Sequence, residues 1–141
     1  MALLSRKGLL AIAAVIDVAL YHRGHPVSAK ALAVRHHLPA RHLEPVLQAL
    51  VRDGILKGIR GPRGGYELAR DRKKITADDI LRAAGTIEED GDLGKLSSAL
   101  LNEVVRPAVS QAEKAFSAAL GRINVEDLAR RAEPLRDISA S

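Results

Sequence analysis

The spacing of hydrophobic residues along the chain is typical of packed helices. In several segments the apolar positions recur every three to four residues, which is the period of one helical face. The segments expected to be helical are 5–21, 29–37, 40–52, 77–84, 96–123 and 125–131. Aromatic residues make up only 2% of the chain, so the core is expected to consist of aliphatic side chains, which suits helices better than a β-sandwich.

Prolines are expected to limit these helices. Pro45 lacks the N–H that would bond to Arg41, so the start of its helix is expected to be irregular or kinked. Pro107 is expected to kink the longest helix or to split it in two. Residues 134–141, which begin with Pro134, are expected to form a loose tail.

Two short helices separated by a tight turn are expected in the first half of the chain. Ser28 is a suitable N-cap for 29–37, and a Leu-Pro break precedes the second helix, 40–52. Gly54 suits the position just after the end of that helix. This arrangement is a helix-turn-helix, in which the second helix is the candidate reader of the DNA major groove.

A short basic hairpin is expected directly after the helix-turn-helix. Residues 55–59 and 66–69 are candidate strands, and the run Arg-Gly-Pro-Arg-Gly-Gly at 60–65 lies between them. Glycines and a proline at this density predict a tight turn, and this turn carries two arginines. The sequence therefore predicts a mainly α fold, a winged helix-turn-helix with a small two-stranded β wing.

The apolar stripe of the segment 96–123 indicates contact with a partner chain. As one helix it would span about 40 Å at 1.5 Å per residue, and one small domain cannot cover so long an apolar stripe. A partner chain is therefore the expected cover of this stripe. We therefore expect a DNA-binding domain over 1–85, and a linker loop, a long dimerisation helix and a short C-terminal helix over 86–141.

The charge distribution agrees with this division. Residues 1–74 hold 14 Lys/Arg and 5 Asp/Glu, a net charge of +9, whereas residues 75–141 hold 8 and 12, a net charge of −4. A basic head on a mildly acidic body is typical of a protein that binds a polyanion such as double-stranded DNA, although an ordinary solvated surface would also fit.

The composition excludes several other kinds of site. The chain has no cysteine, which removes disulfides, thiolate zinc sites, cysteine nucleophiles and cysteine-held iron–sulfur clusters. No nucleophile elbow, phosphate-binding loop or metal-ligand signature is present, so no enzyme and no bound cofactor are expected. Asp17 interrupts the apolar run near the N-terminus, and no run is long enough to cross a bilayer, so we expect a cytoplasmic protein without membrane contact.

Four runs of residues together resemble the Rrf2 family of bacterial winged-helix transcriptional regulators, those of the IscR, NsrR and CymR type. The runs are LEPVLQAL at 43–50, DGIL at 53–56, RGPRGGYEL at 60–68 and ITADDI at 75–80. A glycine-rich turn alone is a weak signal, but an Arg-Gly-Pro-x-Gly-Gly-Tyr wing after a Leu-Glu helix is a strong one. The resemblance is densest over 27–84.

The resemblance implies a dimer that reads DNA with two elements, and it suggests roles for residues of this chain. The wing arginine of the family reaches into the minor groove, a role that falls on Arg60 with Arg63 beside it. Residues near base edges at the start of the recognition helix would be Ala40, Arg41 and Glu44. Residues that touch phosphate would be Ser28 and Lys30. Cluster-binding members carry three cysteines after the fourth helix, and this chain has none there, so the effector stays open.

Each of these assignments has a plainer alternative. Arg60 and Arg63 could lie on a solvated turn, and Arg41 could hold a phosphate rather than a guanine edge. Glu44 could accept from cytosine or repel wrong bases, or it could pair with Arg41 or brace the start of its helix. Five histidines fall between 22 and 42, which invites a metal-sensing interpretation, but surface histidines are more common.

The sequence therefore favours a dimeric, sequence-specific DNA-binding regulator, and more specifically a repressor. Two alternatives use the same scaffold for another purpose. One is a protein-interaction module, against which the basic head argues, and the other is a histidine-based metal sensor.

Overall fold

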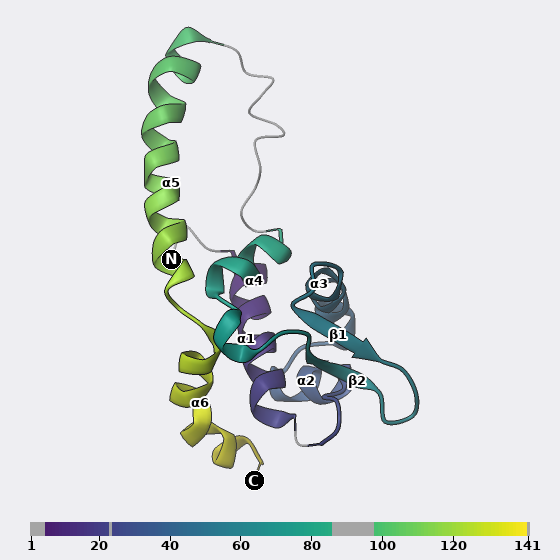
Figure 1. The fold of residues 1–141 in the computed structure, drawn as a ribbon. Helices are drawn as coiled ribbons and strands as arrows, with labels where there is room; N and C mark the ends of the chain where they lie inside the picture. Colours follow the sequence, from purple (N-terminus) through teal and green to yellow (C-terminus); the bar gives the residue numbers. More distant parts are fainter. Residues whose placement is uncertain (1–4, 23, 86–97, 141) are drawn as a thin grey trace.

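A computed structural model describes residues 5–22, 24–85 and 98–140, and it shows a helical chain with one small sheet (Figure 1). The elements in chain order are α1 (Arg6–Tyr21), α2 (Ala29–Arg35), α3 (Ala40–Arg52), β1 (Leu56–Ile59), β2 (Gly65–Leu68), η1 (Arg72–Lys74), α4 (Ala77–Ala83), η3 (Leu101–Val105), α5 (Arg106–Gly121) and α6 (Val125–Ala140). The order of the first helices and the hairpin is the one that the sequence predicts. The expected linker, 86–95, and the first residues of the expected long helix lie outside the described residues.

The helix-turn-helix consists of α2 and α3. The Ser28 hydroxyl oxygen accepts a hydrogen bond from the Ala31 N–H at 3.1 Å, which caps α2. The helix ends at Arg35 rather than at the expected residue 37, because His37 adopts a left-handed conformation with φ 54° and turns the chain toward α3. The bounds of α3 are as predicted, and the helix runs through Pro45 without a break.

The hairpin is joined to the helix-turn-helix through the backbone. Leu56 pairs with Leu68 at its open end and Ile59 with Gly65 next to the turn. The residue before the cap of α2, Val27, adds a bridge to Tyr66, with N···O distances of 3.0 and 2.8 Å. A Cβ at Gly65 would collide with the Val27 backbone, so this close approach requires glycine. The wing is therefore fixed to the segment that begins the helix-turn-helix.

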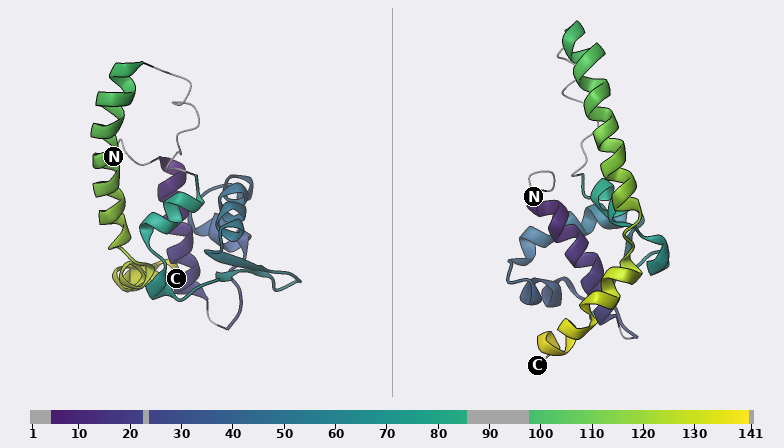
Figure 2. Two further views of the ribbon diagram at one scale, coloured as in Figure 1. Left: turned by 45° about the horizontal axis from the view of Figure 1, so that its top comes forward. Right: turned by 90° about the vertical axis from the view of Figure 1, so that its left-hand side faces the viewer.

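The core lies between α1, α2, α3 and α4 and is aliphatic, as the composition predicts. Its largest fully buried side chains are Leu32, Leu43, Leu47, Leu50, Ile55, Leu56, Ile75, Ile80, Leu81, Val15, Val18 and Val125. The last of these belongs to α6, so the C-terminal helix contributes to the same core. Figure 2 shows α6 packed crosswise against α1, whereas α5 projects away from the body.

Of the two outcomes expected at Pro107, a kink or a split into two helices, the structure excludes the split. Residues 99–121 are helical without interruption, and the turn before the proline is a π-helix in which the Arg106 N–H donates to the Leu101 carbonyl, five residues back. Proline lacks an N–H and its ring crowds the carbonyl four residues earlier. The wider π turn absorbs both defects, so the helix continues.

The expectation of a loose tail over 134–141 is wrong, because α6 continues to Ala140. Asn124 begins this helix as predicted, its side-chain oxygen accepting from the Asp127 N–H at 2.9 Å. Pro134 removes only one helical hydrogen bond, and an ion pair between Glu133 and Arg136 at 2.7 Å supports the turn around it. Among the described residues no helix is both long enough and apolar enough to span a membrane.

Candidate nucleic-acid interface

One face of α3 is buried and the other is open to solvent. Leu43, Val46, Leu47 and Leu50 point into the core, whereas Arg41 and Glu44 are exposed. Ala40, at the first position of the helix, is half-buried. In the described part of the chain Glu44 forms no ion pair with Arg41, so the expected alternative of an intrahelical pair is not seen and both side chains remain open to a ligand.

The two expected phosphate contacts lie at the start of α2. Lys30 is exposed, and Ser28 is half-buried because its hydroxyl oxygen accepts from the Ala31 N–H. That bond uses the oxygen as an acceptor, so the hydroxyl proton can still be donated to a phosphate oxygen.

The wing carries its two arginines on an exposed turn. Arg60 and Arg63 are both exposed, and the turn is closed by a hydrogen bond from the Gly64 N–H to the Gly61 carbonyl at 2.9 Å. Gly61 has a φ of 116°, which side chains disfavour, and a Cβ at Gly64 would collide with the Ile59 carbonyl oxygen. The glycines therefore keep the turn thin, so that its backbone and arginines can approach a narrow groove.

A charged residue of α3 also acts electrostatically on the wing. Burial, and next the negative charge of Glu44, raise the pKa of Tyr66, so that the phenol stays neutral well into the alkaline range. Tyr66 is the residue that bridges to Val27. Tyr66 therefore joins the wing to the start of the helix-turn-helix through its backbone, and its phenol senses the charge of Glu44 on α3.

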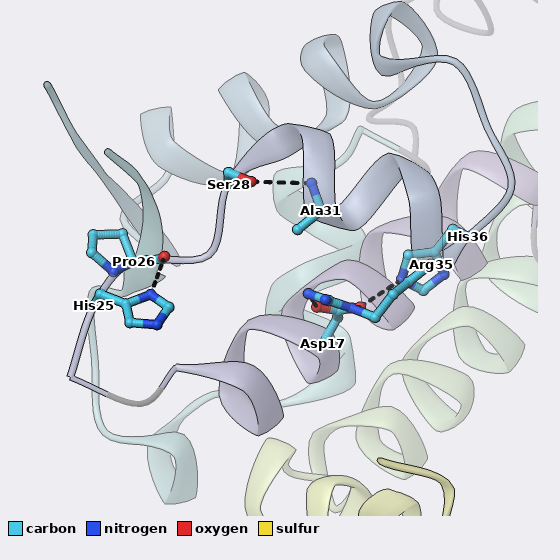
Figure 3. A network of polar contacts seen from close by, with 7 residues as sticks. All are labelled: Asp17, His25, Pro26, Ser28, Ala31, Arg35 and His36. Carbon is cyan, nitrogen blue, oxygen red and sulfur yellow. Dashed lines mark hydrogen bonds and ion pairs between the residues drawn. The ribbon is translucent and has the colours of Figure 1, made fainter. Parts of the chain in front are cut away.

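Sequence reasoning missed a buried ion pair beneath this face. Asp17 on α1 is only 5% exposed, and its two oxygens accept from Arg35 on α2 at 2.9 and 2.7 Å (Figure 3). The His36 ring lies 3.1 Å from the same carboxylate, and the Arg35 guanidinium lies 3.8 Å from the centre of the Tyr21 ring. The hydrogen bond to Asp17 raises the pKa of Arg35. The signal available in the sequence was Asp17 itself, a charge inside an apolar helix that needs a partner.

The histidines are dispersed over separate contacts. His22 Nε2 lies 2.7 Å from a Glu67 carboxylate oxygen on β2, and His25 Nδ1 lies 3.1 Å from the Pro26 carbonyl, whereas His36 contacts Asp17. Within the described residues no three His, Cys, Asp or Glu side chains gather as a metal site would require. The geometry therefore gives the metal-sensing alternative no support.

A capped helix-turn-helix joined to a thin basic hairpin defines the winged helix-turn-helix class of DNA-binding proteins. The model of the Rrf2 family, described as an iron-dependent transcriptional regulator, matches residues 4–131, and the chain belongs to this family. This confirms the resemblance and the mainly helical winged-helix fold predicted from the sequence. The family consists of transcriptional regulators rather than enzymes.

The relatives and solved structures agree with this assignment. An HTH-type transcriptional regulator of Synechocystis sp. is 34% identical over 126 residues, which cover 89% of this chain and 86% of that protein. The structure of T. potens IscR matches with a TM-score of 0.71 and 31% identity, covering 93% of this chain and 88% of that one. The structure of CymR, the global cysteine regulator of B. subtilis, matches with a TM-score of 0.70 and 29% identity, covering 90% and 95%.

Other curated relatives match over less of their length. The chain spans about half of an HTH-type transcriptional regulator of Haemophilus influenzae and of an IscR, 53% and 49% respectively. Both alignments cover 80 residues.

The residues of this chain do not fit an iron–sulfur cluster of the cysteine-ligated kind. Such clusters are held by cysteine thiolates, and the chain contains no cysteine. Cluster-binding members carry their ligands in the segment that corresponds to about 90–105 here, and its first part, 90–97, lies outside the described residues. This chain therefore keeps the DNA-binding scaffold of the family without its thiolate donors.

Proposed function

We propose that this protein is a homodimeric repressor that reads a DNA operator with α3 in the major groove and the wing, 60–66, in the minor groove. The observation that carries the proposal is the bridge between Val27 and Tyr66, which holds the basic turn and the helix-turn-helix as one unit. Because the two elements are joined by backbone hydrogen bonds, they can present their exposed side chains to one DNA segment together.

The side chains divide between reading bases and holding phosphates. Arg41 can donate two hydrogen bonds to a guanine edge, and Glu44 can accept from cytosine and reject other bases. Ala40 is small enough to let the helix approach the bases closely. Arg60 is suited to the negative potential of a narrow minor groove, with Arg63 beside it. Ser28 and Lys30 can hold phosphate oxygens.

The long helix supports assembly as a dimer. Leu100, Val104 and Val109 are 67%, 59% and 50% exposed on the helical segment 99–121, which projects from the body. Burying this apolar surface against the same segment of a second copy would remove it from water and would place two recognition helices side by side. In this proposal residues 1–85 bind DNA and 86–141 provide the linker and the dimer contact, while α6 packs back on α1.

The test uses DNA fragments selected by the wild-type protein from a genomic library. Arg60→Ala and Arg41→Ala are each expected to weaken binding to the selected site by about tenfold or more, which corresponds to the 1–3 kcal/mol of a base contact. Arg131→Ala, which removes an exposed arginine from α6, is the control and should bind as the wild type does.

Three results would overturn parts of the proposal. If Arg60→Ala binds the operator as tightly as the wild type does, the wing does not read the minor groove. A wild-type protein that shifts no DNA at physiological salt but co-purifies with another protein would favour the interaction module instead. Expression of a reporter behind the selected site that rises with the protein would contradict repression.

A further inference from the structure

A cleft of about 580 Å³ opens between the entrance of the helix-turn-helix and the tip of the wing. Among the described residues, its lining contains basic and neutral side chains and no acidic one. The residues that matter to its chemistry are Tyr21, His25, Ser28, Ala31, Arg35 and Arg63. A basic cleft of this composition favours an anion.

Arg35 is a donor held in place on one wall of this cleft. Asp17 takes two of its five N–H bonds, and the Tyr21 ring supports the guanidinium plane from 3.8 Å. In the described part of the chain no acceptor contacts the remaining three N–H bonds. The Arg35 side chain is only 21% exposed, and its bonds to Asp17 fix its geometry before any ligand arrives. The Asp17 carboxylate that neutralises it lies behind it, buried and fully engaged by Arg35 and His36.

The other basic groups of the cleft come from two loops. Arg63 extends from the wing and is exposed, and His25 is held by the Pro26 carbonyl in the segment before α2 (Figure 3). Ser28, at the start of α2, also lines the cleft, and its hydroxyl retains a proton to donate. Donors from α2, from its leading segment and from the wing therefore line one cleft, and no ion pair between described residues spans it.

The position and the size of the cleft together indicate its ligand. With α3 in the major groove and the wing in the minor groove, as proposed above, the DNA strand between the two grooves would pass the space between α2 and the wing tip, where the cleft opens. The volume is large for one phosphate ion but suits a sugar–phosphate unit, since ligand pockets of about 300–1,000 Å³ hold small organic molecules.

We propose that this cleft binds a phosphodiester unit of the DNA backbone, held between Arg35 on α2 and Arg63 on the wing. The inference rests on the proposed function, and it adds Arg35 and His25 to the DNA-contacting surface. It also gives Arg63 a role distinct from that of Arg60, since Arg63 would hold a phosphate rather than enter the minor groove. Contacts of this kind carry no sequence information, so they should strengthen binding to every duplex alike.

The first variant pair tests the cleft without touching the buried ion pair. Ala31 is half-buried in the cleft lining, so Ala31→Glu places a carboxylate where the phosphate would lie, and Ala31→Gln adds the same bulk without the charge. Ala31→Glu is expected to bind both the selected operator and a random-sequence duplex about tenfold more weakly than Ala31→Gln, because its carboxylate would repel the phosphate. A tenfold loss of affinity is about the size of the contribution of one charged hydrogen bond. The ratio of the two affinities should stay unchanged.

The second pair tests the phosphate contact through its salt dependence. Neutralising one phosphate contributes about 0.9 to the slope of log K against log salt concentration. Arg63→Ala should lower that slope by about this amount on both duplexes, while Arg131→Ala on α6 should leave it unchanged. Arg60→Ala should differ from Arg63→Ala by reducing the preference for the operator.

The outcomes separate this inference from the proposed function. If wild-type protein binds the operator and Arg60→Ala loses it, but Ala31→Glu equals Ala31→Gln on both duplexes, the cleft does not hold DNA and the inference fails alone. If inorganic phosphate or a mononucleotide binds wild-type protein saturably and not Ala31→Glu, while duplex affinity is the same for both, the cleft is a site for a free anion and the assignment to DNA is overturned. If wild-type protein binds no duplex, the proposed function fails first.

Discussion

The helices α3 and α5 are both amphipathic, but they differ in what covers their apolar side. In α3 the residues Leu43, Leu47 and Leu50 are 0% exposed, because α1, α2 and α4 surround them. In α5 only Leu120 is buried, and the apolar residues toward the far end of its helical segment are open to solvent. The comparison teaches that an apolar stripe indicates a contact without saying whether the contact lies within the chain or between chains.

The largest effect is expected inside α3, where the cover is internal. Leu47→Ala should lower the free energy of unfolding by about 2–5 kcal/mol, since a fully buried leucine leaves a cavity. The neighbouring exposed Gln48→Ala should change it by less than about 0.5 kcal/mol. Urea unfolding measures both. Equal losses of unfolding free energy in the two variants would mean that Leu47 is not more buried than Gln48.

The ion pair beneath the helix-turn-helix should come next. Arg35→Ala removes the main partner of the buried Asp17 and should cost about 2–3 kcal/mol of unfolding free energy, near the lower end for a broken buried pair because His36 remains as a partner. Arg131→Ala on α6 is the matched control. If Asp17→Asn combined with Arg35→Ala is no more stable than Arg35→Ala alone, an unpaired charge is not the cause of the loss.

On the helical segment 99–121, which contains η3 and α5, the same kind of change should affect assembly rather than folding. Val104→Glu, at a position 59% exposed, should leave the unfolding of the separated chain within about 0.5 kcal/mol of the wild type. It should weaken self-association by about tenfold or more, because a charge would enter an apolar contact. Sedimentation over a range of protein concentrations tests this, with Gln111→Glu on the same helix as the control. A wild-type protein that stays monomeric at high concentration would contradict the dimer.

The smallest effect concerns Tyr66, which links the wing to α3. Its pKa is raised in the folded state by burial and by Glu44, so its contribution to stability is present below the unfolded pKa of about 10 and is lost as pH rises through the folded value. Tyr66→Phe should therefore lose less stability than the wild type between neutral pH and strongly alkaline pH. Thermal unfolding across that range measures the difference, and parallel curves would argue against a perturbed tyrosine.

The fold of the first half could be predicted from sequence because its signals are local. Ser28 caps α2, Gly54 follows α3 with a φ of 75°, and the glycines of the wing demand a turn, so each element is determined by a few adjacent residues. The helix α6 was predicted too short, because the proline at 134 was interpreted as an end. Its persistence depends on neighbours that the local sequence does not reveal.

The candidate site was predictable in its exposed parts and hidden in its buried ones. The exposed arginines of the wing and of α3 follow from turn chemistry and helical spacing. The partner of Asp17, by contrast, lies 18 residues away on another helix, and no local pattern connects the two. The cleft between α2 and the wing likewise depends on the bridge from Val27 to Tyr66, a long-range pairing that becomes visible only in three dimensions.

The central claim, that the chain binds specific DNA as a dimer, is tested most directly by selecting bound fragments from a genomic library at physiological salt and footprinting the protein on them. The account predicts enrichment of a pseudo-palindromic sequence in which two half-sites, about 10 base pairs apart or a multiple of that distance, are both protected. Failure to enrich any fragment, or equal retention of all fragments, would contradict it.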